Sequence, residues 1–138
     1  MTSSQYILGM VVCAFFLVGG MVDYWQSARH HHKPIPYVLE KYFALFWLIL
    51  YSGVLPFTLI FLASGFNFFV AKTYLGFAFI GFVLWDIVFS LLDKKTLISD
   101  QEAYWFWGDK DYPLSKGQVA VWHLIRLIVG MTILMFWR

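Results

Sequence analysis

The chain has 138 residues, of which 61% are hydrophobic and only 13% are charged, and its formal net charge at pH 7 is +2. A soluble domain carries about 25% charged residues, and a chain this short has too little interior to keep so much apolar surface away from water. The composition therefore excludes a water-soluble globular fold and predicts an integral membrane protein. The small positive charge, without a long basic run, also argues against nucleic acid as a partner.

The first predicted membrane span covers residues 6–22, an apolar run without an acidic residue. At about 17 residues it lies at the short end of the lengths that cross a bilayer. The preceding residues lack the basic region of a signal peptide, so we expect this span to be retained. The helix can continue past Asp23 into the interface, and we expect it to be broken by Pro34 and Pro36.

Between the first two predicted spans lies a basic segment with three consecutive histidines. Neighbouring side chains on a helix diverge by about 100°, and on an extended chain only His30 and His32 share a side. A metal site needs three or four converging ligands, so these two histidines are weak metal candidates. Because Arg29 and Lys33 flank the run, we interpret the segment as one that binds lipid headgroups.

The apolar stretch of residues 42–92 is too long for one span and predicts two, at 42–63 and 73–92. A cluster of turn formers at residues 64–67 predicts a tight connection between them. Lys72, just before the later span, can extend its ammonium group to the headgroups.

A proline in the middle of the second predicted span should disturb its backbone. Pro56 has no N–H to donate to the carbonyl of Ser52, four residues earlier. We therefore expect a free carbonyl and a kink at this place.

Residues 93–117 form the one substantial polar loop between predicted spans. A capping-box sequence inside it predicts a short helix that ends in four consecutive aromatic residues, 104–107, and lies flat in the membrane interface. A second capping box, formed by Ser115 and Gln118, predicts the start of the last span, at 118–137.

The basic residues predict the orientation of these spans. Seven of the ten Lys and Arg residues lie in the loops 23–41 and 93–117. The positive-inside rule puts both loops in the cytoplasm and both termini on the non-cytoplasmic side. The sequence thus predicts a single transmembrane domain: an all-α, four-transmembrane-helix antiparallel bundle with a short interfacial helix, in a prokaryotic or organellar inner membrane.

Three ionisable residues fall inside the predicted spans. Such a residue costs about 2.5–3.5 kcal/mol on insertion scales and needs a partner or a wet cavity. With a rise of about 1.5 Å per residue, Asp86 lies roughly 9 Å, His123 roughly 8 Å and Arg126 roughly 12 Å from the cytoplasmic ends of their spans. We hypothesise that Arg126 pairs with Asp86 beside His123, and that Tyr51 and Ser90 complete an intramembrane polar layer.

The sequence contains no phosphate-binding glycine loop, Ser–His–acid set or cysteine pair. The leading hypothesis is therefore a structural or accessory subunit of a larger membrane complex, of respiratory, photosynthetic or oxygenase type. Such a protein contacts lipid and other membrane subunits and has no catalytic activity of its own; no cofactor is predicted. Two hypotheses remain beside it: a small oligomeric channel or transporter that uses the polar layer, and a membrane enzyme or cofactor-binding subunit that uses His123 or His30–His32.

Overall fold

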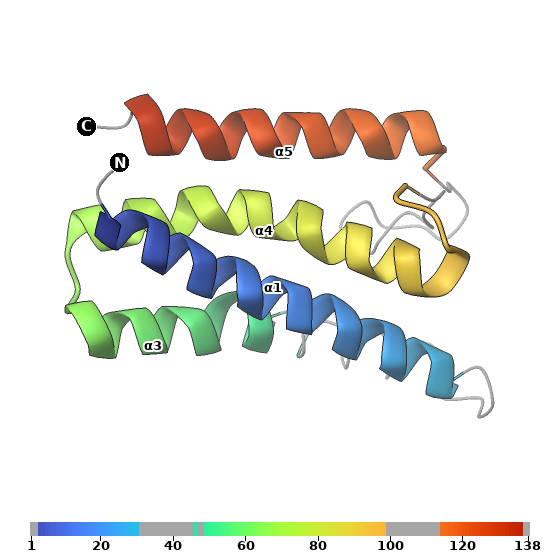
Figure 1. Ribbon diagram of the computed structural model, residues 1–138, viewed down its shortest axis with the longest axis horizontal. Coiled ribbons are helices and arrows are strands. Elements are labelled where there is room, and N and C mark those ends of the chain that lie inside the picture. Colours follow the sequence, from blue (N-terminus) through green and yellow to red (C-terminus); the bar gives the residue numbers. More distant parts are fainter. Residues whose placement is uncertain (1–2, 31–45, 47–48, 99–113, 137–138) are drawn as a thin grey trace.

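A computed structural model describes residues 3–30, 46, 49–98 and 114–136 of the chain (Figure 1). In these residues the protein is all-α. The elements in chain order are α1 (Ser3–His30), the π-helix η1 (Leu50–Val54), which continues directly into α3 (Leu55–Ser64), α4 (Phe68–Lys94) and α5 (Lys116–Phe136). The helices alternate in direction along the chain, so that the start of α1 and the end of α5 lie at the same end of the molecule (Figure 1).

Three of the described helices are long and apolar enough to cross a membrane: Gln5–Trp25 within α1, and the whole of α4 and α5. The apolar helix Leu50–Ala63, made of η1 and most of α3, is shorter. The chain is thus a multi-pass membrane protein with three candidate spans. The early part of the predicted span 42–63 lies mostly outside the described residues.

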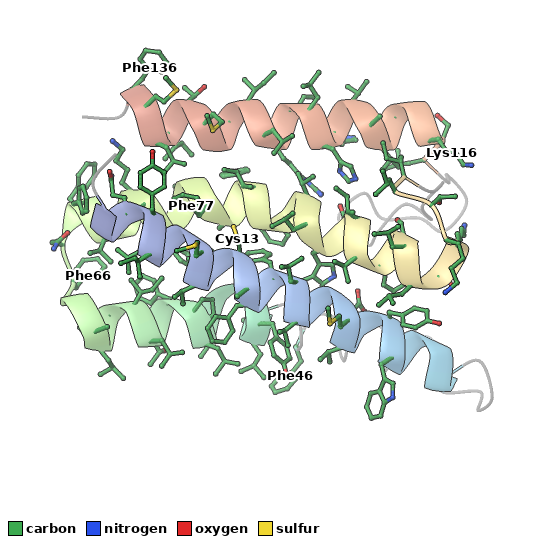
Figure 2. The ribbon with its side chains drawn as sticks, viewed as in Figure 1. Cys13, Phe46, Phe66, Phe77, Lys116 and Phe136 are labelled. Atoms are coloured by element: carbon green, nitrogen blue, oxygen red, sulfur yellow. The ribbon has the colours of Figure 1, made fainter. Side chains whose placement is uncertain are left out.

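The central element is α4, which packs against α1 on one side and α5 on the other (Figure 1). The short helix formed by η1 and α3 packs against α1 and also contacts α4. The hydrophobic core lies among α1, α3 and α4, and its buried residues are Val12, Phe16, Ile60, Val70, Ala78 and Trp85. Side chains also project from the outer faces of α3 and α5, where most end in carbon (Figure 2).

Close packing of α4 against α5 depends on two facing glycines. A Cβ atom on Gly130 would lie 2.7 Å from the carbonyl oxygen of Gly76, and one on Gly76 would overlap Leu134. On the other side of α4, the ring of Phe16 from α1 occupies the space beside Gly81. Small residues thus let the backbones of neighbouring helices approach one another, as is common in membranes.

The predicted turn at residues 64–67 is confirmed. The first helix of the pair ends at Ser64, and Gly65 follows with a positive φ of 70°, a conformation that glycine adopts without steric strain. Asn67 then caps the next helix, since its side-chain oxygen accepts a hydrogen bond from the N–H of Val70 at 2.8 Å. Because of this cap, α4 begins at Phe68 and includes Lys72, earlier than the predicted start at residue 73.

The predicted capping box at the start of the last span is also confirmed. The N–H of Ser115 donates to Gln118 Oε1 at 2.9 Å, and the N–H of Gln118 donates to Ser115 Oγ at 3.4 Å. The helix α5 therefore starts at Lys116, two residues before the predicted span. The predicted interfacial helix at 104–107 lies outside the described residues.

The first helix is longer than the predicted span. It continues to His30, and the apolar segment Gln5–Trp25 includes Asp23. The predicted continuation of the helix past Asp23 is confirmed, because backbone hydrogen bonding continues past the point where hydropathy falls. The bounds of the membrane span itself stay a prediction. The side chains of Arg29 and His30, together with His32 and Lys33, lie outside the described part, so the headgroup and metal predictions for them stay predictions.

Pro56 lies next to an irregular stretch of helix. In η1 the N–H of Leu55 bonds to the carbonyl of Leu50, one residue farther back than in an α-helix. The carbonyl of Ser52, which Pro56 cannot bind, accepts a hydrogen bond from the Tyr74 hydroxyl of α4. A side chain of a neighbouring helix thus satisfies the carbonyl that the proline leaves free, as membrane helices require.

Candidate functional site

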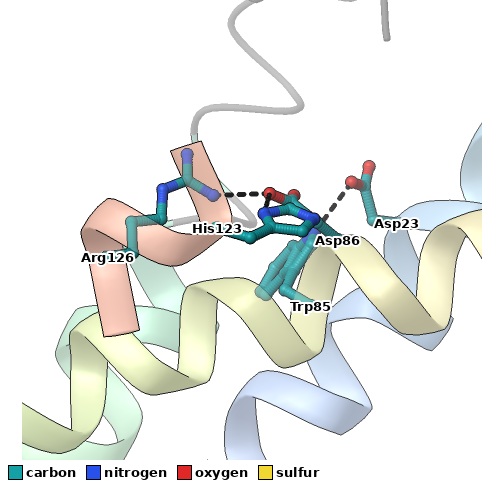
Figure 3. Close-up of polar contacts among 5 residues, drawn as sticks. All are labelled: Asp23, Trp85, Asp86, His123 and Arg126. Carbon is teal, nitrogen blue, oxygen red and sulfur yellow. Dashed lines mark hydrogen bonds and ion pairs between the residues drawn. The ribbon is translucent and has the colours of Figure 1, made fainter. Parts of the chain in front are cut away.

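Asp86 of α4 and Arg126 of α5 are in direct contact (Figure 3). Arg126 Nη1 donates to Asp86 Oδ2 at 2.5 Å, and the two side chains are 34% and 16% exposed. The guanidinium carbon of Arg126 also lies 5.8 Å from the centre of the Phe82 ring, on α4, within the range of a cation–π interaction. The pair offsets two charges inside the candidate spans and joins α5 to α4.

His123 lies beside this pair on the same face of α5. Its side chain is buried, and its Nδ1 atom is 3.9 Å from the same carboxylate oxygen, Asp86 Oδ2. That distance is too long for a hydrogen bond, and among the described residues Nδ1 has no hydrogen-bond partner. Because Arg126 lies three positions after His123, the two side chains share a face of the helix and both reach toward Asp86.

The neighbouring residue on α4 extends this group of polar side chains to α1. Trp85 Nε1 donates to Asp23 Oδ2 at 3.0 Å (Figure 3). The indole ring packs against Gly19, and the backbone of Trp85 lies against Gly20, so that an added Cβ atom on either glycine would come too close to Trp85. Asp23, Trp85, Asp86, His123 and Arg126 are called the polar cluster below.

Sequence reasoning missed the contribution of α1. The helix was expected to continue past Asp23, but the predicted span stopped at residue 22 and sequence reasoning assigned Asp23 no partner. Two signals pointed to it: the adjacent glycines Gly19 and Gly20, which open a space on α1, and the position of Asp23 about one turn farther along.

Tyr51 and Ser90, the other residues of the predicted polar layer, occupy different places. The ring of Tyr51, in η1, packs against the hydrophobic core. Ser90 is buried about one turn beyond Asp86, and its carbonyl accepts the N–H of Lys95 at the end of α4. Their membership of the polar layer stays a prediction.

The polar cluster joins all three candidate spans. Its acids are Asp23 and Asp86, its permanent cation is Arg126, and His123 can be neutral or charged. Within the described residues, no group of three or more His, Cys, Asp or Glu side chains is placed to hold a metal ion. The arrangement can therefore hold helices together, bind an ion that balances its charge, or exchange protons.

The chain matches no protein-family model, curated protein or solved structure with which it was compared.

Proposed function

We propose that this protein is an accessory subunit of a larger membrane complex, to which it contributes packed helices. The observation that supports the proposal most directly is the apolar surface of α5 that the described part of the chain leaves uncovered. Among the described residues, a smaller share of α5 than of α1 or α4 is buried within the chain. The residues of α5 that are buried against the chain are Val119, His123, Gly130 and Leu134.

The remaining surface of α5 is suited to contact other membrane helices. Most of its exposed side chains are large and apolar, and these include Val121, Leu124, Ile125, Ile128, Met131 and Met135. Its two ionisable residues inside the span, His123 and Arg126, contact or approach Asp86 of α4 instead. In this proposal the polar cluster fixes which helices are neighbours, and the apolar face of α5 packs against helices of a partner subunit.

We also propose that residues 42–63 form a fourth span, of which Leu50–Ala63 is the described apolar part. Helix α4 follows this segment after a tight turn, as expected for two consecutive spans. The distribution of Lys and Arg supports a topology with the loops 23–41 and 93–117 in the cytoplasm and both termini outside.

The size of the native complex tests the accessory-subunit proposal. The chain is to be extracted from its own membrane in a mild detergent, with a photo-crosslinking residue at Ile128 on the exposed face of α5. We expect the 16.2 kDa chain to migrate in a much larger complex and to crosslink to one different membrane polypeptide at constant stoichiometry.

A matched control places the same crosslinker at Val119, which is buried against the chain. That variant should give little crosslinking to the partner. Migration as a monomer or as an oligomer of this chain alone would contradict the proposal.

A small channel or transporter is the second candidate, supported by the polar cluster reaching all three candidate spans. Asp86→Asn should then abolish ion flux in liposomes that contain only this protein. A role for His123 as a cofactor ligand has less support, because the residue is only 7% exposed and its ring approaches Asp86 rather than an open space.

A further inference from the structure

The polar cluster contains more acid than permanent base. Asp23 and Asp86 each carry a negative charge when ionised, and Arg126 supplies one positive charge. If His123 is neutral, the cluster has one uncompensated negative charge. An uncompensated charge is costly inside a membrane and is usually removed by pairing or by neutralisation.

The described basic residues outside the cluster lie near the ends of the candidate spans. Lys94, Lys95 and Lys116 are exposed, and Lys72 lies in the early part of α4, roughly 21 Å along the helix from Asp86. The other element close to the core, η1, contains no Lys, Arg, His, Asp or Glu residue. Of these elements, only α5 places a cation in contact with an acid of the cluster.

His123 is one group of the polar cluster that can supply the missing positive charge. Its side chain is more than nine-tenths buried, and Nδ1 approaches the carboxylate of Asp86 without a hydrogen-bond partner among the described residues. Figure 3 shows the imidazole ring directed at this carboxylate, between Arg126 and Trp85. A proton on the imidazole, or on either carboxyl group, brings the cluster to zero net charge.

We propose that the polar cluster is a proton-binding site, which at neutral pH holds one dissociable proton shared among Asp23, Asp86 and His123. The three groups interact, so the proton belongs to the cluster as a unit rather than to one residue. Trp85 stabilises the Asp23 side by donating a hydrogen bond, and Arg126 stabilises the Asp86 side. The site is independent of whether the chain is an accessory subunit or a transporter.

Nuclear magnetic resonance of the full chain in lipid nanodiscs tests this proposal. Carbon-13 in the Asp carboxyl groups and nitrogen-15 in the His rings report directly which groups are protonated. At neutral pH we expect one proton on the cluster, visible as a neutral carboxyl group of Asp23 or Asp86 or as a charged imidazole of His123. Two ionised carboxylates beside a neutral imidazole would overturn the proposal.

Variants then test whether the bound proton is there to compensate the excess negative charge of the polar cluster. Asp23→Asn removes one negative charge and should therefore remove the bound proton while Asp86 stays ionised. The control is Asp93→Asn, at the exposed end of α4, which should leave the signal of the cluster unchanged. Retention of the proton in Asp23→Asn, or its loss in Asp93→Asn, would contradict the assignment. The wild-type spectrum decides the proposal even if Asp23→Asn does not fold.

Discussion

Asp86 is a carboxylate within a membrane span, and its contact with Arg126 offsets its charge. Arg126→Leu removes the cation and leaves the acid largely buried. We expect this variant to lower the free energy of unfolding by about 3 kcal/mol, near the lower end of the range for breaking a buried pair. Thermal unfolding and denaturation by dodecyl sulfate in detergent micelles measure the loss.

The double variant Arg126→Leu with Asp86→Asn separates pairing from general damage. Because it removes the unpaired charge, it should regain part of the stability that Arg126→Leu loses. Strictly additive losses from the two substitutions would show that the contact does not stabilise the protein.

The hydrogen bond from Trp85 to Asp23 can be tested by removing the indole N–H alone. Trp85→Phe keeps an aromatic ring beside Gly19 but removes the N–H that binds Asp23. Hydrogen bonds to charged groups contribute about 1.5–3 kcal/mol, so we expect a loss of about that size in the same unfolding measurement. In an Asp23→Ala background the substitution should have a much smaller effect; an unchanged loss would mean that ring packing alone is responsible.

At the scale of elements, the contact of α4 with α5 depends on the glycine pair. A methyl group at residue 130 would meet the carbonyl oxygen of Gly76, so Gly130→Ala should push the helices apart and destabilise the protein by about 1–3 kcal/mol. Gly53→Ala is a matched control, because nothing lies within 4 Å of its added Cβ atom. Equal stability of both variants would show that the helices tolerate a wider separation.

A second prediction at this scale concerns the hydrogen bond from Tyr74 to the π-helix. Tyr74→Phe removes the hydroxyl that binds the carbonyl of Ser52, and we expect it to cost about 0.5–1.5 kcal/mol of stability. In a Pro56→Ala background, the new N–H of residue 56 can bind the same carbonyl. In that background Tyr74→Phe should therefore cost less stability. An identical loss of stability in both backgrounds would contradict this account. Unfolding in detergent measures the three variants and the wild type.

At the scale of the whole molecule, the proposed topology puts the C-terminus and the 93–117 loop on opposite sides of the membrane. A reporter that is active only outside the cytoplasm should work after residue 138 and fail when it is inserted in that loop. The expectation follows from the four lysines of the loop. Reporters that are active at both positions would refute the topology.

Much of the order of the helices could be predicted, because the sequence signals for helices and turns are local. Hydropathy indicates the apolar helices, turn formers indicate the break at 64–67, and Ser115 with Gln118 indicates the start of α5. The rise per residue also places Asp86 and Arg126 at similar depths, and the structure records a contact between them.

Sequence reasoning missed two features, for physical reasons. Asp23 follows the drop in hydropathy, which does not coincide with the end of backbone hydrogen bonding in α1. Its donor, Trp85, leaves no periodic signal that reveals a partner 62 residues away. The choice of neighbours around α4 depends on how side chains fit at Gly76 and Gly130, a property of pairs of helices that one helix does not display.

The contact between Asp86 and Arg126 also has a consequence for the biogenesis of the protein. Arg126 follows Asp86 by 40 residues, so at ribosomal rates of about 5–20 residues per second it is made roughly 2–8 s later. During that interval α4 carries a carboxylate whose guanidinium partner has not been synthesised. Insertion of α5 therefore supplies the cation that pairs with the carboxylate of α4. A nascent chain that stops short of Arg126 presents an unpaired acid to the quality-control proteases of the membrane.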